Sequence, residues 1–174
     1  EPLGEISYIG KVGMTFKPND RFSLDVDYSY RRTDQWMVHL YGSTMGGYDA
    51  VHIQPKVAMD LFLSAKQQLR FSLQWVGIKA TAQELYQIPG GDGTLIPITG
   101  GNPPEAANFT ISRIATQLRY RWEIAPLSDL FLVYTRGSNL PSAYGDGFND
   151  LFTDALTDPI IDLFVIKLRY RFGN

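Results

Sequence analysis

Hydrophobic and polar side chains alternate residue by residue along most of this chain, and the alternation is strictest near its C-terminus. In the segment 163–172, LFVIKLRYRF, the even positions from Phe164 to Phe172 are apolar or aromatic, and the odd positions from Lys167 to Arg171 are basic. Successive side chains of a β-strand point to opposite faces of a sheet. The period of two therefore predicts a strand with one apolar face and one cationic face.

The same period recurs in six earlier segments. Together with the C-terminal segment, the predicted strands are residues 5–17, 22–31, 51–63, 69–79, 114–124, 130–135 and 163–172. The predicted fold class is all-β, an antiparallel sheet of about seven strands in a single domain spanning residues 1–174. An eighth strand within Trp36–Tyr41 is the alternative. Pro55 lies inside the third predicted strand and cannot donate a ladder hydrogen bond, so it predicts a bulge or a local break.

The connections between the predicted strands alternate between short and long. Short turns are expected around Asn19, Ala65 and Pro126. The long connections are 32–49, a loop or an extension of the strands, and two Gly-, Pro- or Asp-rich loops at 81–108 and 137–159. Outer-membrane barrels have short periplasmic turns and long extracellular loops. The pattern therefore predicts an antiparallel transmembrane β-barrel of the outer membrane, with about 7 to 8 strands in this chain.

An odd strand count does not close a bacterial single-chain barrel, because such barrels have even numbers of strands. We therefore expect this chain to be a fragment, the C-terminal portion of a larger barrel. The first ten residues lack the basic patch and hydrophobic core of a signal peptide, so either one has been removed or the chain starts internally.

Composition narrows the classes of protein that remain. The 174 residues carry a formal net charge of -2, which gives no reason to expect a nucleic-acid partner. The absence of cysteine excludes thiolate metal sites and cysteine catalysis. No apolar run approaches the roughly 18 to 20 residues of a membrane-spanning helix, which leaves only a closed barrel as a way to cross a bilayer.

Charged residues of the predicted strands fall mainly on the parity opposite to the apolar one. With lipid outside the barrel, this parity lines the lumen, where opposite charges on neighbouring strands form ion pairs. The predicted lumen-lining charged residues are Lys11, Asp25, Asp27, Arg31, Lys56, Asp60, Arg70, Arg119, Arg121, Glu123, Lys167, Arg169 and Arg171.

Candidate catalytic residues are few. Asp25 and Asp27 project from one face roughly 7 Å apart, a spacing that an acid and base pair tolerates. The many basic residues on that face favour internal ion pairs instead. His39 and His52 are the two histidines, and no serine motif accompanies either, so both are interpreted as structural. We predict no catalytic residue and no cofactor.

Metal binding is likewise not predicted. The weak candidates are oxygen ligands in the acidic loop, which does not have the spacing of an EF-hand, so solvated turn residues are the better interpretation. These candidates are Asp146, Asn149 and Asp150.

Two segments resemble the C-terminal end of a family of bacterial outer-membrane proteins of unknown function. They are Arg121–Gly137, RWEIAPLSDLFLVYTRG, and Asp158–Phe172, DPIIDLFVIKLRYRF. In that family a domain similar to family-nine carbohydrate-binding modules precedes a large membrane-associated β-barrel region. The resemblance implies a bacterial outer-membrane location, a barrel completed by the N-terminal part of the same protein or by a partner chain, and carbohydrate as a further candidate partner. It carries over no catalytic residues.

The terminal strand is also similar to the signal that the outer-membrane barrel assembly machinery recognises, which favours an aromatic residue at or near the end of the last strand. Here Gly173 and Asn174 follow the final aromatic residue. The predicted assembly signal consists of Phe164, Ile166, Leu168, Tyr170 and Phe172.

These patterns together predict an outer-membrane β-barrel protein with a structural or transport role and with specificity in long extracellular loops. The expected partners are outer-membrane lipid and the assembly machinery. An outer-membrane hydrolytic enzyme is one alternative. A soluble lipocalin-like binding protein is another, because its apolar parity would line a ligand cavity while the charged parity faced water.

Overall fold

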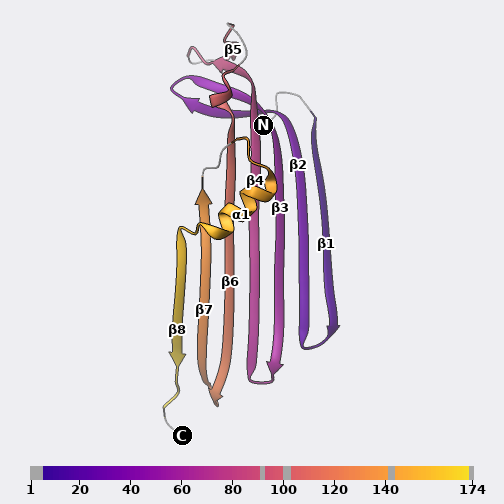
Figure 1. The fold of residues 1–174 in the computed structure, drawn as a ribbon, viewed down its shortest axis with the longest axis vertical. Coiled ribbons are helices and arrows are strands. Elements are labelled where there is room, and N and C mark those ends of the chain that lie inside the picture. The colour runs from indigo at the N-terminus through magenta and orange to yellow at the C-terminus, as the bar shows by residue number, and fades with distance from the viewer. Residues whose placement is uncertain (1–5, 91–92, 100–102, 141–143, 173–174) are drawn as a thin grey trace.

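The computed structural model describes residues 6–90, 93–99, 103–140 and 144–172, which form one antiparallel sheet with an α-helix on one face (Figure 1). The strands are β1 (Ser7–Asn19), β2 (Phe22–Tyr41), β3 (Thr44–Ser64), β4 (Gln67–Gln87), β5 (Ile96–Pro97), β6 (Phe109–Ala125), β7 (Ser128–Leu140) and β8 (Ile161–Arg169). The helical elements are the 3-10 turn η1 (Glu105–Ala107) and the helix α1 (Phe148–Thr157).

The all-β antiparallel prediction is confirmed. The sheet has eight strands in the described part of the chain, and its order β1-β2-β3-β4-β6-β7-β8 follows the sequence, with β5 paired to the upper end of β4. Every predicted strand corresponds to one of these strands. Residues 91–92, 100–102 and 141–143 of the predicted long loops, and residue 5 of the first predicted strand, lie outside the described residues.

The sheet is not closed into a barrel. Among the described residues, β1 pairs only with β2 and β8 pairs only with β7, and the two strands lie at opposite sides of the sheet (Figure 1). The described strands therefore do not close a barrel among themselves. Both edges leave backbone groups unpaired, over 13 residues in β1 and 9 in β8. Natural sheets usually pair or cover such edges.

The central strands are longer than the alternation predicts. β2 has 20 residues and β3 and β4 have 21 each, which at about 3.3 Å per residue is about 65–70 Å of extended chain. The prediction of a loop at 32–49 is wrong, and its alternative, an extension of the strands, is correct. Residues 36–41 continue β2 and are not a separate eighth strand, because only Gly42 and Ser43 separate β2 from β3.

A β-bulge in β2 explains why the alternation is hard to follow beyond residue 33. Thr33 pairs with Ala50 and Trp36 pairs with Tyr48, so two residues of β2 lie opposite one residue of β3. Gln35 has a φ of 54° there, and its backbone N–H donates to Asp49 at 3.2 Å. The bulge transfers the apolar parity of β2 to the opposite face of the sheet, since Trp36 shares a face with Thr33.

Of the two outcomes predicted at Pro55, the bulge is absent and the local break is present: the β3–β4 pairing runs from Ile53–Gly77 to Lys56–Gln74 in one register, without a pair at Gln54 or Pro55. Tyr28 pairs with Pro55, and the neighbouring pairs Asp27–Lys56 and Ser29–Gln54 have the same register. The proline therefore keeps the register with β2 and interrupts the pairing only on the β4 side.

The prediction that 137–159 is entirely a loop is also wrong, because this segment contains α1. The apolar residues of the helix recur at the spacing of one helical face and pack on the sheet. The helix and the sheet form one hydrophobic cluster. From the helix it contains Leu151 and Ala155, both fully buried, with Phe148, Phe152 and Leu156 around them, and from the sheet it contains Trp75, Ile114, Ile53 and Leu73. Gly77 makes the close approach possible, since a Cβ there would lie 2.4 Å from the Trp75 ring and 3.1 Å from Phe148.

Candidate functional site

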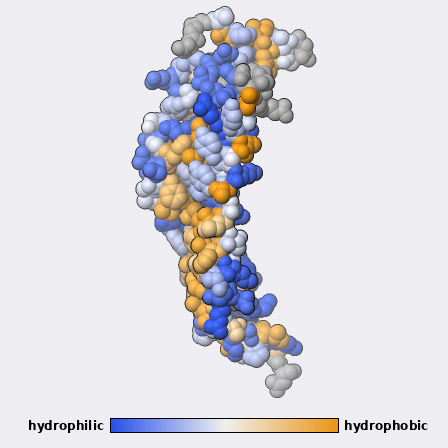
Figure 2. Space-filling view, turned by 90° about the vertical axis from the view of Figure 1, so that its right-hand side faces the viewer, coloured by the Kyte–Doolittle hydropathy of each residue, from blue (hydrophilic) through white to orange (hydrophobic). Residues whose placement is uncertain are grey.

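The two faces of the sheet differ in chemistry over the half that contains the β1–β2, β3–β4 and β6–β7 turns, which we call the lower half. Its apolar face carries alternate residues such as Val26, Val57 and Leu73, which the strand register places side by side. Its polar face carries the residues between them. Viewed along the sheet edge, hydrophobic side chains gather on one side of the lower half and hydrophilic ones on the other (Figure 2).

The charged residues predicted to line a lumen all lie on the polar face. The register pairs Asp27 with Lys56, Asp60 with Arg70, and Arg169 with Asp129. Arg171 follows the end of β8 and its backbone N–H donates to Ser128 Oγ at 3.1 Å. The full set is Lys11, Asp25, Asp27, Arg31, Lys56, Asp60, Arg70, Arg119, Arg121, Glu123, Lys167, Arg169 and Arg171.

Two carboxylates organise the lower part of the polar face. The side chain of Asp129 is 2% exposed. Its Oδ1 accepts a hydrogen bond from Arg121 Nε at 2.9 Å, and its Oδ2 accepts one from Arg169 Nη2 at 2.5 Å. Asp60 accepts hydrogen bonds from Gln68 and from Arg70 Nε, the latter at 3.0 Å. Asp60 thus joins β3 to β4, and Asp129 joins β7 to β6 and β8 on the polar face.

The contacts of Asp25 and of the two histidines in the described residues do not form a catalytic arrangement that would support a hydrolytic enzyme. Asp25 accepts a hydrogen bond from Thr15 Oγ1 at 2.6 Å. His39 Nε2 lies 2.9 Å from the carbonyl oxygen of Gly42, and His52 packs edge-on against Trp36 with ring centroids 5.3 Å apart. Among the described residues, neither histidine forms a hydrogen bond to a serine or a carboxylate.

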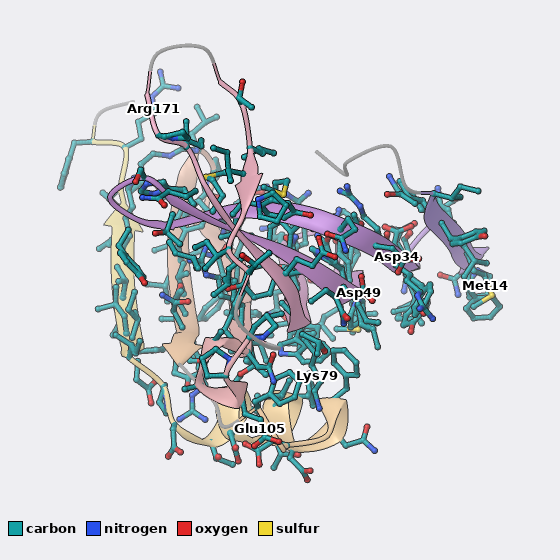
Figure 3. The ribbon with its side chains drawn as sticks, turned by 90° about the horizontal axis from the view of Figure 1, so that it is seen from above. Met14, Asp34, Asp49, Lys79, Glu105 and Arg171 are labelled. Carbon is teal, nitrogen blue, oxygen red and sulfur yellow. The ribbon has the colours of Figure 1, made fainter. Side chains whose placement is uncertain are left out.

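The upper half of the polar face is covered by apolar side chains. We call Trp36, Tyr48 and Phe109 the upper aromatic cluster; the ring centroids of Trp36 and Phe109 are 6.1 Å apart, and those of Tyr48 and Phe109 are 5.0 Å apart. Since β3 and β4 separate β2 from β6, three strand spacings of about 4.8 Å would otherwise hold these residues about 14 Å apart. The upper β2–β3 hairpin therefore bends over the polar face, as its path across the sheet shows from above (Figure 3).

The small residue Gly47 and the buried residue Tyr86, next to the β-bulge, support this bend. A Cβ on Gly47 would lie 2.3 Å from Gln35 Oε1 and 3.4 Å from the Tyr86 ring, so glycine permits the close packing beside the bulge. The hydroxyl of Tyr86 donates to Glu84, and this hydrogen bond together with burial raises the pKa of Tyr86 to about 12. Tyr86 therefore remains a hydrogen-bond donor at neutral pH.

Helix α1 is attached to the apolar face just above the uncovered apolar residues. Trp75 Nε1 donates to Ser112 Oγ at 3.0 Å, and Ser112 donates to the carbonyl of Leu151 at 2.6 Å. At the C-terminal end of the helix, Arg136 Nη1 donates to the carbonyl of Leu156 at 3.1 Å while Nη2 pairs with Asp162 at 2.9 Å.

The N-terminal side of α1 has its own contact with the sheet. Lys79 lies on the side of the helix (Figure 3), where its ammonium donates to the carbonyl of Asp146 at 2.6 Å and lies 5.4 Å from the centre of the Tyr144 ring. The helix is thus attached to the sheet at its centre and near both of its ends.

A family match covers residues 3–172, almost the whole chain, and the family is described as a domain of unknown function, DUF5916. The chain belongs to the DUF5916 family. No curated protein and no solved structure matches it. The match extends well beyond residues 121–137 and 158–172, the two segments on which the sequence resemblance rests. The family description assigns no membrane location and no activity.

The weak metal candidates of this DUF5916 chain have other roles. Asp150 accepts a hydrogen bond from the backbone N–H of Gly147 at 3.1 Å and so caps the start of α1, and the carbonyl of Asn149 accepts one from Thr153. In the described ranges, no group of three or more His, Asp or Glu residues is arranged to hold a metal ion. Across the same residues, none of the helices has the length and apolar character needed to span a membrane.

Two features of the DUF5916 fold escaped the sequence analysis. Asp129 was not among the predicted lumen residues because its neighbours on the same parity, Phe131 and Val133, are apolar. Helix α1 was missed although apolar residues recur at positions 148, 151, 152, 155 and 156, a helical spacing that identifies an amphipathic segment.

Proposed function

We propose that this DUF5916 chain forms part of the wall of a bacterial outer-membrane β-barrel with a structural or transport role. In this proposal the apolar face contacts lipid, the polar face lines a water-filled lumen, and the end with the short turns is periplasmic. The observation that carries the proposal is an uncovered apolar surface opposite a densely charged one, on a sheet whose two edges are both free.

The height of the apolar surface supports a membrane location. Along β2, the apolar residues from Phe22 to Tyr30 cover about nine residues, whose eight steps make about 26 Å of extended chain at about 3.3 Å per residue. A strand tilted by about 45° needs about 9–11 residues to cross the hydrocarbon layer, and aromatic girdles border the apolar band of such barrels. Aromatic pairs mark the lower border here, with ring centroids of Phe16 and Phe22 6.3 Å apart and those of Tyr170 and Phe172 4.9 Å apart.

Exposure supports the same assignment. Met14 is 61% exposed and Ile166 is 64% exposed, although both lie on regular strands and on the apolar face. Soluble monomers rarely leave so large a contiguous apolar surface in water. A closed lipocalin-like cavity would need the apolar face to enclose a ligand, whereas here the sheet is open.

The free edges support a barrel that further strands complete. In a bilayer, unpaired backbone N–H and C=O groups must be satisfied, so β1 and β8 each require a further antiparallel strand. The N-terminal part of the same protein, or a partner chain, supplies those strands in our proposal. The exposed apolar face of β8 then serves as the assembly signal, and carbohydrate remains a candidate partner through the family resemblance.

Reconstitution of the full-length protein into planar lipid bilayers tests the transport role, and we expect stepwise ion conductance. Because the upper aromatic cluster narrows the lumen side, Trp36→Ala is expected to raise the single-channel conductance by a factor on the order of two. Tyr41→Ala is the matched control, since Tyr41 lies on the same hairpin but is 71% exposed. Inserted, folded protein that never conducts would contradict the transport role, and equal conductance for both variants would contradict a constriction at the upper aromatic cluster.

A further inference from the structure

The charges of the polar face are distributed unequally between its two sides. On β1, β2 and β3, three basic residues, Lys11, Arg31 and Lys56, are balanced by three acidic ones, Asp25, Asp27 and Asp60. On β4, β6, β7, β8 and the residues that follow β8, two acidic residues, Glu123 and Asp129, accompany seven basic ones. These seven are Arg70, Arg113, Arg119, Arg121, Lys167, Arg169 and Arg171. The second side therefore has a formal excess of positive charge.

A like-charged pair lies at the centre of this basic side. Arg70 of β4 is directly opposite Arg119 of β6, and like charges in this position destabilise a sheet. Arg70 is paired with Asp60 at 3.0 Å. Arg119 donates to Gln117 Oε1 at 3.2 Å, but no carboxylate in the described part of the chain lies within ion-pair distance of it.

The Arg70–Arg119 pair borders an open hollow on the polar face. The hollow has a volume of about 310 Å³ and is lined by Gln68, Arg70, Arg119, Arg121, Asp129, Phe131 and Arg169. Four guanidinium groups thus face one carboxylate, and both oxygens of that carboxylate are already occupied by Arg121 and Arg169. The hollow offers further N–H donors, and Asp129 is the one carboxylate among its lining residues.

We propose that this hollow binds an oxyanion group, such as phosphate, sulfate or carboxylate, of a solute, with Arg70 and Arg119 as the principal ligands. A planar guanidinium matches the two oxygens of such a group and makes paired, charge-assisted hydrogen bonds to it. A bound anion also removes the repulsion between the two arginines. The assignment rests on the proposed function in one respect, namely that the solute reaches the hollow through the lumen.

Calorimetric titration of the full-length protein in detergent with inorganic phosphate, at constant ionic strength, tests the site. We expect saturable binding, an affinity loss of about tenfold or more in Arg119→Gln, and a smaller loss in Arg119→Lys, which keeps the charge without the fork of donors. Lys11→Gln is the matched control: it removes a positive charge from the same face on the balanced side, and we expect less than about a twofold change there.

The possible results distinguish failure of the oxyanion site from failure of the proposed barrel. Absence of phosphate binding by wild-type protein that conducts in bilayers, or equal losses in Arg119→Gln and Lys11→Gln, would overturn the site and leave the barrel. Phosphate binding by a protein that does not enter membranes would support the site and overturn the barrel. Competition by anionic phospholipid added to the detergent would place a lipid headgroup in the hollow and overturn the assignment to a solute.

Discussion

Val57→Arg is expected to destabilise the membrane-inserted protein by about 2–4 kcal/mol, the range for a basic residue on the lipid face of a barrel near the bilayer midplane. Val57 lies on the apolar face of β3, where it pairs with Val26 of β2 and Leu73 of β4, midway along the apolar band. Reversible denaturant unfolding of the full-length protein in lipid vesicles measures the effect.

The adjacent residue provides the control. Ala58 lies on the polar face and pairs with Asp25 and Ser72, so Ala58→Arg places the same side chain beside a carboxylate. We expect it to change the free energy of unfolding by less than about 1 kcal/mol. Equal effects of the two variants, or a gain in solubility with Val57→Arg, would argue that the apolar face does not contact lipid.

Trp75→Ala is expected to release helix α1 from the sheet. The Trp75 ring is 3% exposed, contacts Phe148 and Phe152 edge-on, and bonds to Ser112, which in turn holds the Leu151 carbonyl. Truncation of a buried tryptophan typically costs about 3–5 kcal/mol, and here we expect the loss to appear mainly in the docking of the helix. Hydrogen exchange of the amides of residues 148–157 should accelerate by orders of magnitude.

Trp122→Ala is the matched variant for this experiment. Trp122 lies on the same face at the lower end of β6 and is 41% exposed, far from α1. Exchange in α1 should stay unchanged in this variant. Full protection of the helix in Trp75→Ala would show that Arg136 and Lys79 alone are sufficient to hold it, contrary to the packing account.

The lower half of the fold is predictable because its period of two is uninterrupted. Between Phe22 and Arg31 every even residue is apolar and every odd residue is polar, so strand, face and register follow from one pattern. The positions of the charged residues on the polar face follow from the same parity. Pairwise contacts, such as the shared use of Asp129 by Arg121 and Arg169, do not, because they depend on which strands become neighbours.

The upper half is harder to predict because the odd or even position of a residue no longer determines the face of the sheet on which it lies. Arg32 and Asp34 interrupt the apolar even positions after Tyr30, and when an apolar residue returns at Trp36 the bulge at Gln35 has moved it to the opposite face. A sequence pattern alone contains no mark of that switch. In the same way, the alternation of β1 and β8 predicts amphipathic strands but contains no information on whether the two strands meet.

The most direct test of the central claim compares adjacent residues on two strands of the full-length protein in lipid vesicles. Single cysteines, absent from this chain, would replace Val26 and Asp27 on β2 and Leu132 and Val133 on β7. We predict that fluorophores attached at Val26 and Leu132 are quenched by lipids carrying a quencher, whereas cysteines at Asp27 and Val133 react with a water-soluble maleimide. Quenching and labelling that do not alternate between the two faces, or that alternate in the opposite sense, would contradict the account.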